Sequence, residues 1–163
     1  PPQFVLAKAP GRINEYSPTV PHKSLSYQAN LLQLADGHSK GADEVYLLNT
    51  NGNISEGTIS NIFWIKEEKV KTPHYDSGLL PGITREIVFD LCREENIAFE
   101  CGHYPEKELI EADEIFCTNS LRGIVAVYKL LGSEEKTLSS SRLTRKLQRS
   151  YAALVAEECS THK

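Results

Sequence analysis

Short apolar runs bounded by turn residues recur through this chain, and they constrain its fold more than any other feature. One pair of runs flanks Asn51-Gly52, the dipeptide most typical of a two-residue β-hairpin turn. A second pair, residues 61–66 and 69–72, surrounds Glu67-Glu68, and Pro73 then interrupts the ladder. The pattern predicts antiparallel pairing here. Further strand-like runs cover residues 98–101, 114–118 and 124–130.

Helical periodicity interrupts these strands without a regular alternation. Apolar residues recur at helical spacing over residues 24–39, and Gly41 follows as a helix terminator. Leu80-Pro81-Gly82-Ile83-Thr84 opens a second helix, and further helices are expected over residues 105–112 and after residue 141. Because no βαβ rhythm is present, we expect an α/β (α+β) domain with a barrel-like mixed sheet and flanking helices.

Composition narrows the class of protein. The 163 residues are 40% hydrophobic and 25% charged, which is typical of one globular domain. A formal net charge of −4 with scattered basic residues argues against a nucleic-acid or membrane-surface partner, and no apolar run is long enough to span a bilayer. The four cysteines show neither CxxC nor metal-ligand spacing, so we expect reduced thiols, no metal site and a cytoplasmic protein.

Two isolated residues are candidates for chemistry. Lys23 lies at or just before the expected helix start, a place that favours negative charge, so it is either functional or a solvated surface lysine. Glu56 follows a strand-like run and precedes Gly57 and several small hydroxyl and amide residues. That segment is either a polar site or an ordinary loop.

Two further segments offer hydrogen-bond donors. Gly82-Ile83-Thr84 is a candidate phosphate cradle, because glycine lets the backbone approach an anion and the first N–H groups of a helix are unpaired. The alternative is a plain helix start of a common kind. Thr118-Asn119-Ser120 follows a strand and could add hydroxyl and amide donors, a weak signal by itself.

In order and approximate spacing, these segments resemble the class IV pyridoxal-phosphate enzymes, the family of branched-chain and D-amino acid aminotransferases and 4-amino-4-deoxychorismate lyase. The resemblance extends from about His22 to the final helix. It implies the large C-terminal domain of the D-amino acid aminotransferase-like fold, with pyridoxal 5′-phosphate as cofactor. The matching stretches are His22–Leu25, Ile54–Gly57 with Asn61–Phe63, Leu80–Arg85, and Ala112–Phe116.

The resemblance also implies roles for single residues. Lys23 would hold the cofactor covalently and take the substrate's Cα proton, and Glu56 would pair with the pyridine nitrogen. The phosphate would bind the Ile83 N–H and Thr84 together with Asn119 or Ser120. The cofactor-binding set is then Lys23, Glu56, Ser60, Gly82, Ile83, Thr84, Asn119 and Ser120, with Tyr27 as a lining, substrate-side residue.

The segment Thr118-Asn119-Ser120-Leu121 bears on the activity. It resembles the 4-amino-4-deoxychorismate lyases more than the aminotransferases, which implies release of pyruvate to give 4-aminobenzoate for folate synthesis. The alternatives are a branched-chain or D-amino acid aminotransferase and an inactive, truncated cofactor-binding fragment. Arg122 stands beside this segment and is either a ligand for a substrate carboxylate or a surface arginine.

The first residues suggest that an upstream portion is missing. The chain begins Pro1-Pro2 and contains no methionine. Residues 1–22 carry a short apolar run, residues 4–7, and then a Pro/Gly/Asn/Ser-rich stretch, which we interpret as a strand followed by a connector from a smaller N-terminal domain. Residues 23–163 would then form the pyridoxal-phosphate-binding large domain. The resemblance implies a small-molecule substrate and a homodimer.

Overall fold

The computed structural model describes residues 3–25, 27–132, 135–139 and 141–161. The strands are β1 (Gln3–Ile13), β2 (Glu44–Asn49), β3 (Ile54–Gly57), β4 (Asn61–Lys66), β5 (Lys69–Pro73), β6 (Phe99–Gly102), β7 (Glu114–Asn119), β8 (Gly123–Leu131) and β9 (Lys136–Thr137). The helices are α1 (Gln28–Ser39), α2 (Ile83–Glu94), α3 (Glu106–Ile110) and α4 (Arg142–Thr161), with a 3₁₀ turn, η1, at Tyr75–Ser77.

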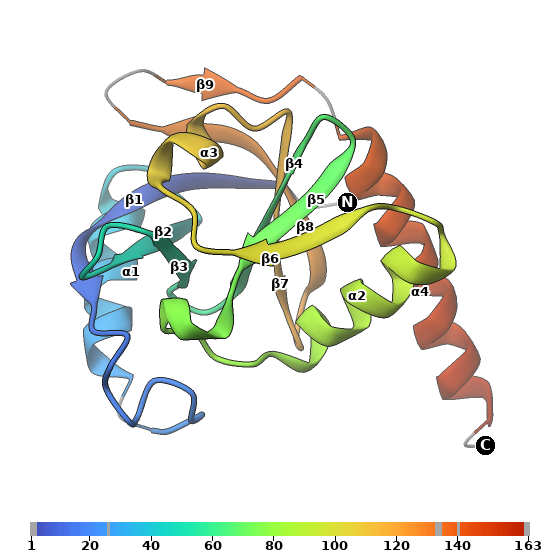
Figure 1. Cartoon of the computed structure of the whole chain (residues 1–163), viewed down its shortest axis with the longest axis horizontal. Coiled ribbons are helices and arrows are strands. Elements are labelled where there is room, and N and C mark those ends of the chain that lie inside the picture. Colours follow the sequence, from blue (N-terminus) through green and yellow to red (C-terminus); the bar gives the residue numbers. More distant parts are fainter. Residues whose placement is uncertain (1–2, 26, 133–134, 140, 162–163) are drawn as a thin grey trace.

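The described strands form one curled mixed sheet with helices around it (Figure 1). Their order is β3-β2-β1-β8-β7-β4-β5-β6, and β9 pairs with β8. The pairs β1–β2, β1–β8 and β5–β6 are parallel, whereas the remaining pairs are antiparallel. The expected mixed, barrel-like sheet is thereby confirmed.

Both predicted hairpins are present. The β2–β3 connection contains Gly52 with a φ of 83°, a left-handed conformation that glycine adopts easily. The β4–β5 turn places Glu67 and Glu68 at φ values of 51° and 62°. Two successive left-handed residues match the twist of the flanking strands.

The helix boundaries differ most at α1. It begins at Gln28 instead of residue 24, so Lys23 lies in the loop before the helix. The helix ends where expected, because Gly41 takes a φ of 84° just beyond it. Helix α2 begins at Ile83 with Gly82 as its extended N-cap, as the sequence predicts.

The strand expected at the start of the chain is present and extends to Ile13, so the connector is shorter than residues 1–22. Residues 3–13 are β1, which lies inside the sheet between β2 and β8. Phe4, Val5, Leu6 and Ala7 are all buried, as is typical of a parallel strand covered on both faces. The irregular connection therefore starts only after Ile13.

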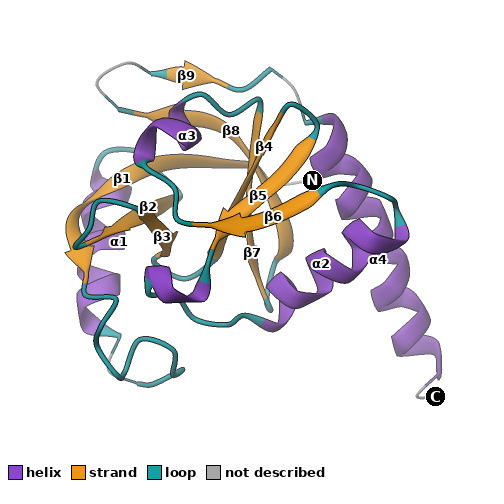
Figure 2. Cartoon of the chain, viewed as in Figure 1, coloured by secondary structure: helices purple, strands orange, loops and turns teal. Residues whose placement is uncertain are grey.

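The core lies on both faces of the sheet. On β4, Trp64 packs with β1 and β2 residues, whereas Phe63 faces α2 and α4. Phe63 stacks on Phe116 with ring centroids 4.8 Å apart. Figure 2 shows α2 and α4 side by side, and their apolar residues join that second cluster. Strand alternation thus divides one strand between two core layers.

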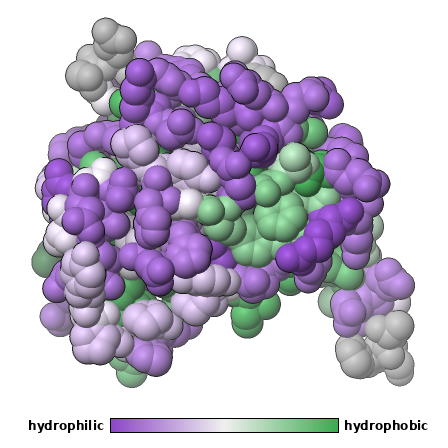
Figure 3. All heavy atoms as spheres, in the orientation of Figure 1, coloured by the Kyte–Doolittle hydropathy of each residue, from purple (hydrophilic) through white to green (hydrophobic). Residues whose placement is uncertain are grey.

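The surface is mostly polar on the face shown in Figure 3, with an apolar area over the region of α2 and β6. The partly buried residues Ile87 and Phe99 belong to this region, and the Arg93 guanidinium lies 5.3 Å from the Phe99 ring centroid. No helix among the described residues is long and apolar enough to cross a membrane.

Candidate functional site

A cavity of about 760 Å³ lies where the loop before α1, β3, the start of α2 and the end of β7 meet. Asn61 on β4 pairs in register with Thr118 on β7, which brings segments far apart in the sequence to one place. The structure brings together nine of the residues singled out from the sequence. They are Lys23, Tyr27, Glu56, Ser60, Gly82, Ile83, Thr84, Asn119 and Ser120.

Glu56 is the buried carboxyl of this cavity. Its side chain comes from β3, is 5% exposed, and accepts a 2.9 Å hydrogen bond from the Leu80 N–H at Oε2. Burial raises the pKa of Glu56 to about 8, and the nearby Glu44 carboxylate adds to the rise, while the Leu80 N–H and the Lys23 charge oppose it. A cationic group bound beside Glu56 would restore its ionised form.

Glu44 is a residue that the sequence reasoning missed. It begins β2, is fully buried, and binds the loop that follows Glu56. Its carboxylate accepts hydrogen bonds from the Thr58 N–H (3.1 Å), the Thr58 hydroxyl, the Ile59 N–H (3.2 Å) and the Ser60 hydroxyl (2.7 Å). Glu44 therefore fixes the loop that lines one wall. An acidic residue opening an otherwise apolar strand was the available signal.

The predicted phosphate cradle has the backbone form that an anion site needs. Gly82 is the N-cap of α2, and a Cβ at this position would overlap Asn61 Oδ1. No side chain caps this helix end, so its first N–H groups are available to a ligand. Thr84 is 2% exposed, whereas the Ile83 side chain is 73% exposed, so Ile83 can contribute only through its backbone.

The turn after β7 is built by Asn119. Its Oδ1 accepts hydrogen bonds from the N–H groups of Leu121 (3.1 Å) and Arg122 (2.9 Å), and its Nδ2 donates to the Ile59 carbonyl at 3.3 Å. Asn119 thus shapes the wall through contacts within the protein. The neighbouring Thr118 hydroxyl is buried, lines the cavity and has no hydrogen-bond partner in the described part of the chain. It is a donor that a bound group could satisfy.

Lys23 and Tyr27 close the side of the cavity nearest α1. Lys23 Nζ lies 5.9 Å from the Tyr27 ring centroid. Burial raises the pKa of Tyr27, and the Glu56 charge acts in the same direction. The Asn30 side chain donates to the Thr58 carbonyl at 3.0 Å, so the start of α1 is joined to the loop that Glu44 holds.

Arg122 is the exception among the predicted residues. It does not line the cavity, and its guanidinium instead lies 5.2 Å from the ring centroid of Phe4. The Arg122 N–H donates a hydrogen bond to Asn119 within the turn, and the Arg122 side chain points toward β1. The structure gives no support to Arg122 as a ligand in this cavity.

A family model described as Amino-transferase class IV matches residues 5–130. The chain belongs to this family. Class IV aminotransferases depend on pyridoxal phosphate, and the matched region contains every lining residue of the cavity.

Individual relatives include both activities considered from the sequence. Aminodeoxychorismate lyase of Bacillus subtilis is 32% identical over 108 residues, 66% of this chain and 37% of that protein. Branched-chain-amino-acid aminotransferase of Escherichia coli is 29% identical over 141 residues, 86% of this chain and 46% of that protein. The solved branched-chain aminotransferase of Thermobaculum terrenum in its PLP form superposes with a TM-score of 0.87 at 29% identity, covering 94% of this chain and 51% of that one.

The chain thus spans about half the length, or less, of these relatives. Within that length, the residues present fit pyridoxal phosphate. A buried carboxyl suits the pyridine nitrogen, and an uncapped helix start behind a glycine suits the phosphate. The Thr118 hydroxyl, which has no partner among the described residues, could donate to an acceptor on the ligand. Lys23 brings an amine to the same cavity.

Proposed function

We propose that this chain is the cofactor-holding part of a class IV pyridoxal-phosphate enzyme, and that the enzyme is a 4-amino-4-deoxychorismate lyase. The observation that supports the lyase is the turn Asn119-Ser120-Leu121, which lines the cavity and is closed by the Asn119 side chain. This turn resembles that of the lyases, and a Bacillus subtilis aminodeoxychorismate lyase is among the relatives.

The proposal assigns the cofactor's three anchoring points. Lys23 Nζ would hold it covalently, the Glu56 carboxylate would accept a hydrogen bond from the protonated ring nitrogen, and the α2 start at Gly82 to Thr84 would bind the phosphate. Ser120 and the Thr118 hydroxyl supply further donors. Ser60 supports the wall through its hydrogen bond to Glu44.

Lys23 would also move the protons of the reaction. When bound, pyridoxal phosphate supplies an electron-withdrawing ring that accepts the electron pair left at the amine-bearing carbon. Lys23 Nζ would take the proton from that carbon, and the bond between the neighbouring ring carbon and the enolpyruvyl oxygen would break. Lys23 would then return the proton to the methylene of the departing enolpyruvate, which leaves as pyruvate. The substrate ring becomes aromatic, and aromatisation drives the step. Apolar lining by Ile59, Leu80 and Leu121 limits access of water.

Branched-chain aminotransferase is the second candidate. It is favoured by the length of the match, because the Escherichia coli enzyme aligns with 86% of this chain and the Bacillus subtilis lyase with 66%. In that reaction Lys23 would move the proton from the substrate's Cα to the cofactor carbon. The same cavity would serve both reactions.

A smaller N-terminal domain and a second subunit would complete the enzyme. Three leucines in α1 and in the loop before it are strongly exposed: Leu25 is 103% exposed, Leu31 52% and Leu32 72%. Such an exposed apolar group is typical of a surface that another protein segment covers. We therefore expect a homodimer, and size-exclusion chromatography with light scattering measures it.

Product analysis separates the two activities. The protein carrying this chain is incubated with pyridoxal phosphate and either aminodeoxychorismate or glutamate plus a branched-chain 2-oxo acid, alongside the Lys23→Ala variant. The lyase forms 4-aminobenzoate and pyruvate from the first substrate, and Lys23→Ala forms neither. Branched-chain amino acid formed only from the second mixture would replace the lyase by the aminotransferase. Cofactor binding without either product would reject both.

A further inference from the structure

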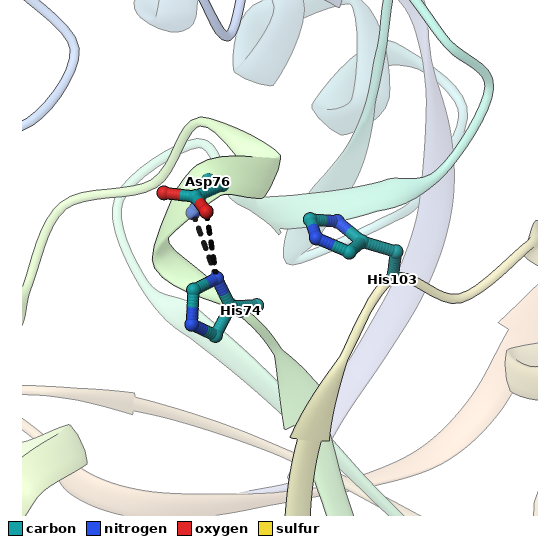
Figure 4. Close-up of side chains that lie close together, drawn as sticks. All are labelled: His74, Asp76 and His103. Atoms are coloured by element: carbon teal, nitrogen blue, oxygen red, sulfur yellow. Dashed lines mark hydrogen bonds and ion pairs between the residues drawn. The ribbon is translucent and has the colours of Figure 1, made fainter.

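Two histidines and an aspartate gather away from the cavity. His74 follows β5, Asp76 lies in η1, and His103 follows β6. One potential ligand atom from each residue lies within 4.8 Å of the other two. Figure 4 shows Asp76 beside His74, with the His103 imidazole facing them from the neighbouring strand. None of the three lines the cavity described above.

The parallel pairing of β5 and β6 creates this arrangement. Pro73 and Gly102 are register partners at the ends of the two strands, and the His74 N–H donates to the Gly102 carbonyl at 2.8 Å. His74 and His103 each follow one of these partners along the chain. Their ring centroids are 5.6 Å apart. Two imidazoles are therefore held side by side by backbone pairing.

Contacts with η1 residues orient the two histidine side chains. The His103 Nδ1 lies 3.1 Å from the Ser77 hydroxyl, and the His74 Nδ1 lies 3.3 Å from Asp76 Oδ2. The turn itself is closed by the Ser77 N–H, which donates to the His74 carbonyl at 2.9 Å. A histidine that ligates a metal usually engages its other ring nitrogen in a hydrogen bond, as the Ser77 hydroxyl allows for His103.

We propose that His74, Asp76 and His103 form a binding site for a divalent transition metal ion of the zinc class. Two imidazole nitrogens and one carboxylate oxygen are ligands that Zn²⁺ accepts, and water would complete the coordination. Ligand atoms around one zinc ion lie closer than 4.8 Å, so the side chains must rotate slightly inward. Their exposure permits this, since the His74 side chain is 44% and the Asp76 side chain 78% exposed.

Metal binding would stabilise η1, the turn that precedes the candidate phosphate cradle at the start of α2. The Ser55 hydroxyl donates to the Gly78 carbonyl at 2.7 Å, and the Leu80 N–H donates to Glu56. The metal would therefore link the ends of β5 and β6 to the segment after η1, which is already hydrogen-bonded to β3. A ligand that binds only the folded state raises the melting temperature.

Calorimetric titration of the cofactor-free chain with ZnCl₂ tests the proposal. His103→Ala removes one imidazole, and Asp76→Asn removes the carboxylate charge at a highly exposed position where folding is not at risk. His38→Ala is the matched control, since His38 is exposed and lies outside the cluster. Circular dichroism verifies that each variant is folded.

We expect wild type and His38→Ala to bind one zinc ion per chain with the same affinity. Both cluster variants are expected to bind at least about 10-fold more weakly, because loss of even a supporting group typically costs 10- to 100-fold. Zinc should also raise the melting temperature of wild type by more than that of Asp76→Asn at the same zinc concentration. Absence of zinc binding by wild type, or wild-type affinity in either cluster variant, would overturn the proposal.

Discussion

At the scale of single residues, Glu56 and Glu44 differ in how many hydrogen bonds their buried carboxyl groups accept. Both are buried carboxyl groups, yet Glu44 accepts several hydrogen bonds from one loop, whereas the Leu80 N–H to Glu56 is a single backbone contact. Burial, only partly offset by the Leu80 N–H and the Lys23 charge, raises the pKa of Glu56 to about 8. A buried group held at a cost to stability is typical of a functional site.

The pH dependence of stability should reveal Glu56 in the cofactor-free chain. The folded state binds its proton more tightly than the unfolded state, so the stabilising contribution is complete below about pH 4.5 and is lost as the pH rises through about 8. The loss is on the order of 5 kcal/mol. Urea unfolding of Glu56→Gln, which mimics the protonated acid, should therefore match wild type at pH 4.5 and exceed it at pH 9. Parallel profiles for the two proteins would show that Glu56 titrates normally.

Removal of Glu44 should weaken the fold and alter Glu56. Glu44→Ala leaves buried donors of Thr58 and Ser60 unpaired, so we expect a loss of at least about 2 kcal/mol in the free energy of unfolding. Glu94→Ala, at an exposed position on α2, is the control and should change little. Because the Glu44 charge raises the pKa of Glu56, that pKa should fall in the variant. An unchanged unfolding midpoint would contradict the role given to Glu44.

At the scale of elements, the β4–β5 turn has glutamates at two positions whose left-handed backbone favours glycine or asparagine. Glu67 and Glu68 both take left-handed φ values, which are costly for residues other than glycine, asparagine and aspartate. The ion pair between Glu68 and Arg142 is exposed on both sides and contributes little.

Replacement of this pair by Asn-Gly should stabilise the chain. We expect Glu67→Asn/Glu68→Gly to raise the free energy of unfolding by about 1 kcal/mol, as the left-handed strain is relieved. Asn96→Gly, at another left-handed position, should yield a smaller gain because asparagine already tolerates that conformation. Chemical denaturation compares the three proteins. A loss of stability in the double variant would show that the glutamate side chains matter more than backbone strain.

The local elements were largely predictable from the sequence, and their long-range pairing was not. The Asn51-Gly52 hairpin, the acidic turn and the start of α2 at Ile83 follow from local turn and capping chemistry. The position of β1 inside the sheet depends on parallel pairing with β2 and β8, which local patterns do not encode. For the same reason, no local pattern indicated that His74 and His103 would lie side by side.

At the scale of the whole molecule, the curled sheet collects donors from distant segments into one cavity. Pattern and resemblance placed nine residues there, and the structure brings all nine together. Two residues show the limits of sequence reasoning. Arg122 was assigned from its place beside a loop, although side-chain direction depends on the turn that Asn119 closes. Glu44 was missed because its partners lie on a loop that folds back over β2.

The most direct test of the account is borohydride reduction of the chain in the presence of pyridoxal phosphate, followed by peptide mapping of the labelled lysine. Absorbance spectra before and after reduction accompany the mapping, and Lys23→Ala is treated in parallel. The account predicts a covalent adduct on Lys23 in wild type and loss of both the adduct and the associated absorbance band in the variant. An adduct on a different lysine, or undiminished labelling of Lys23→Ala, would contradict it.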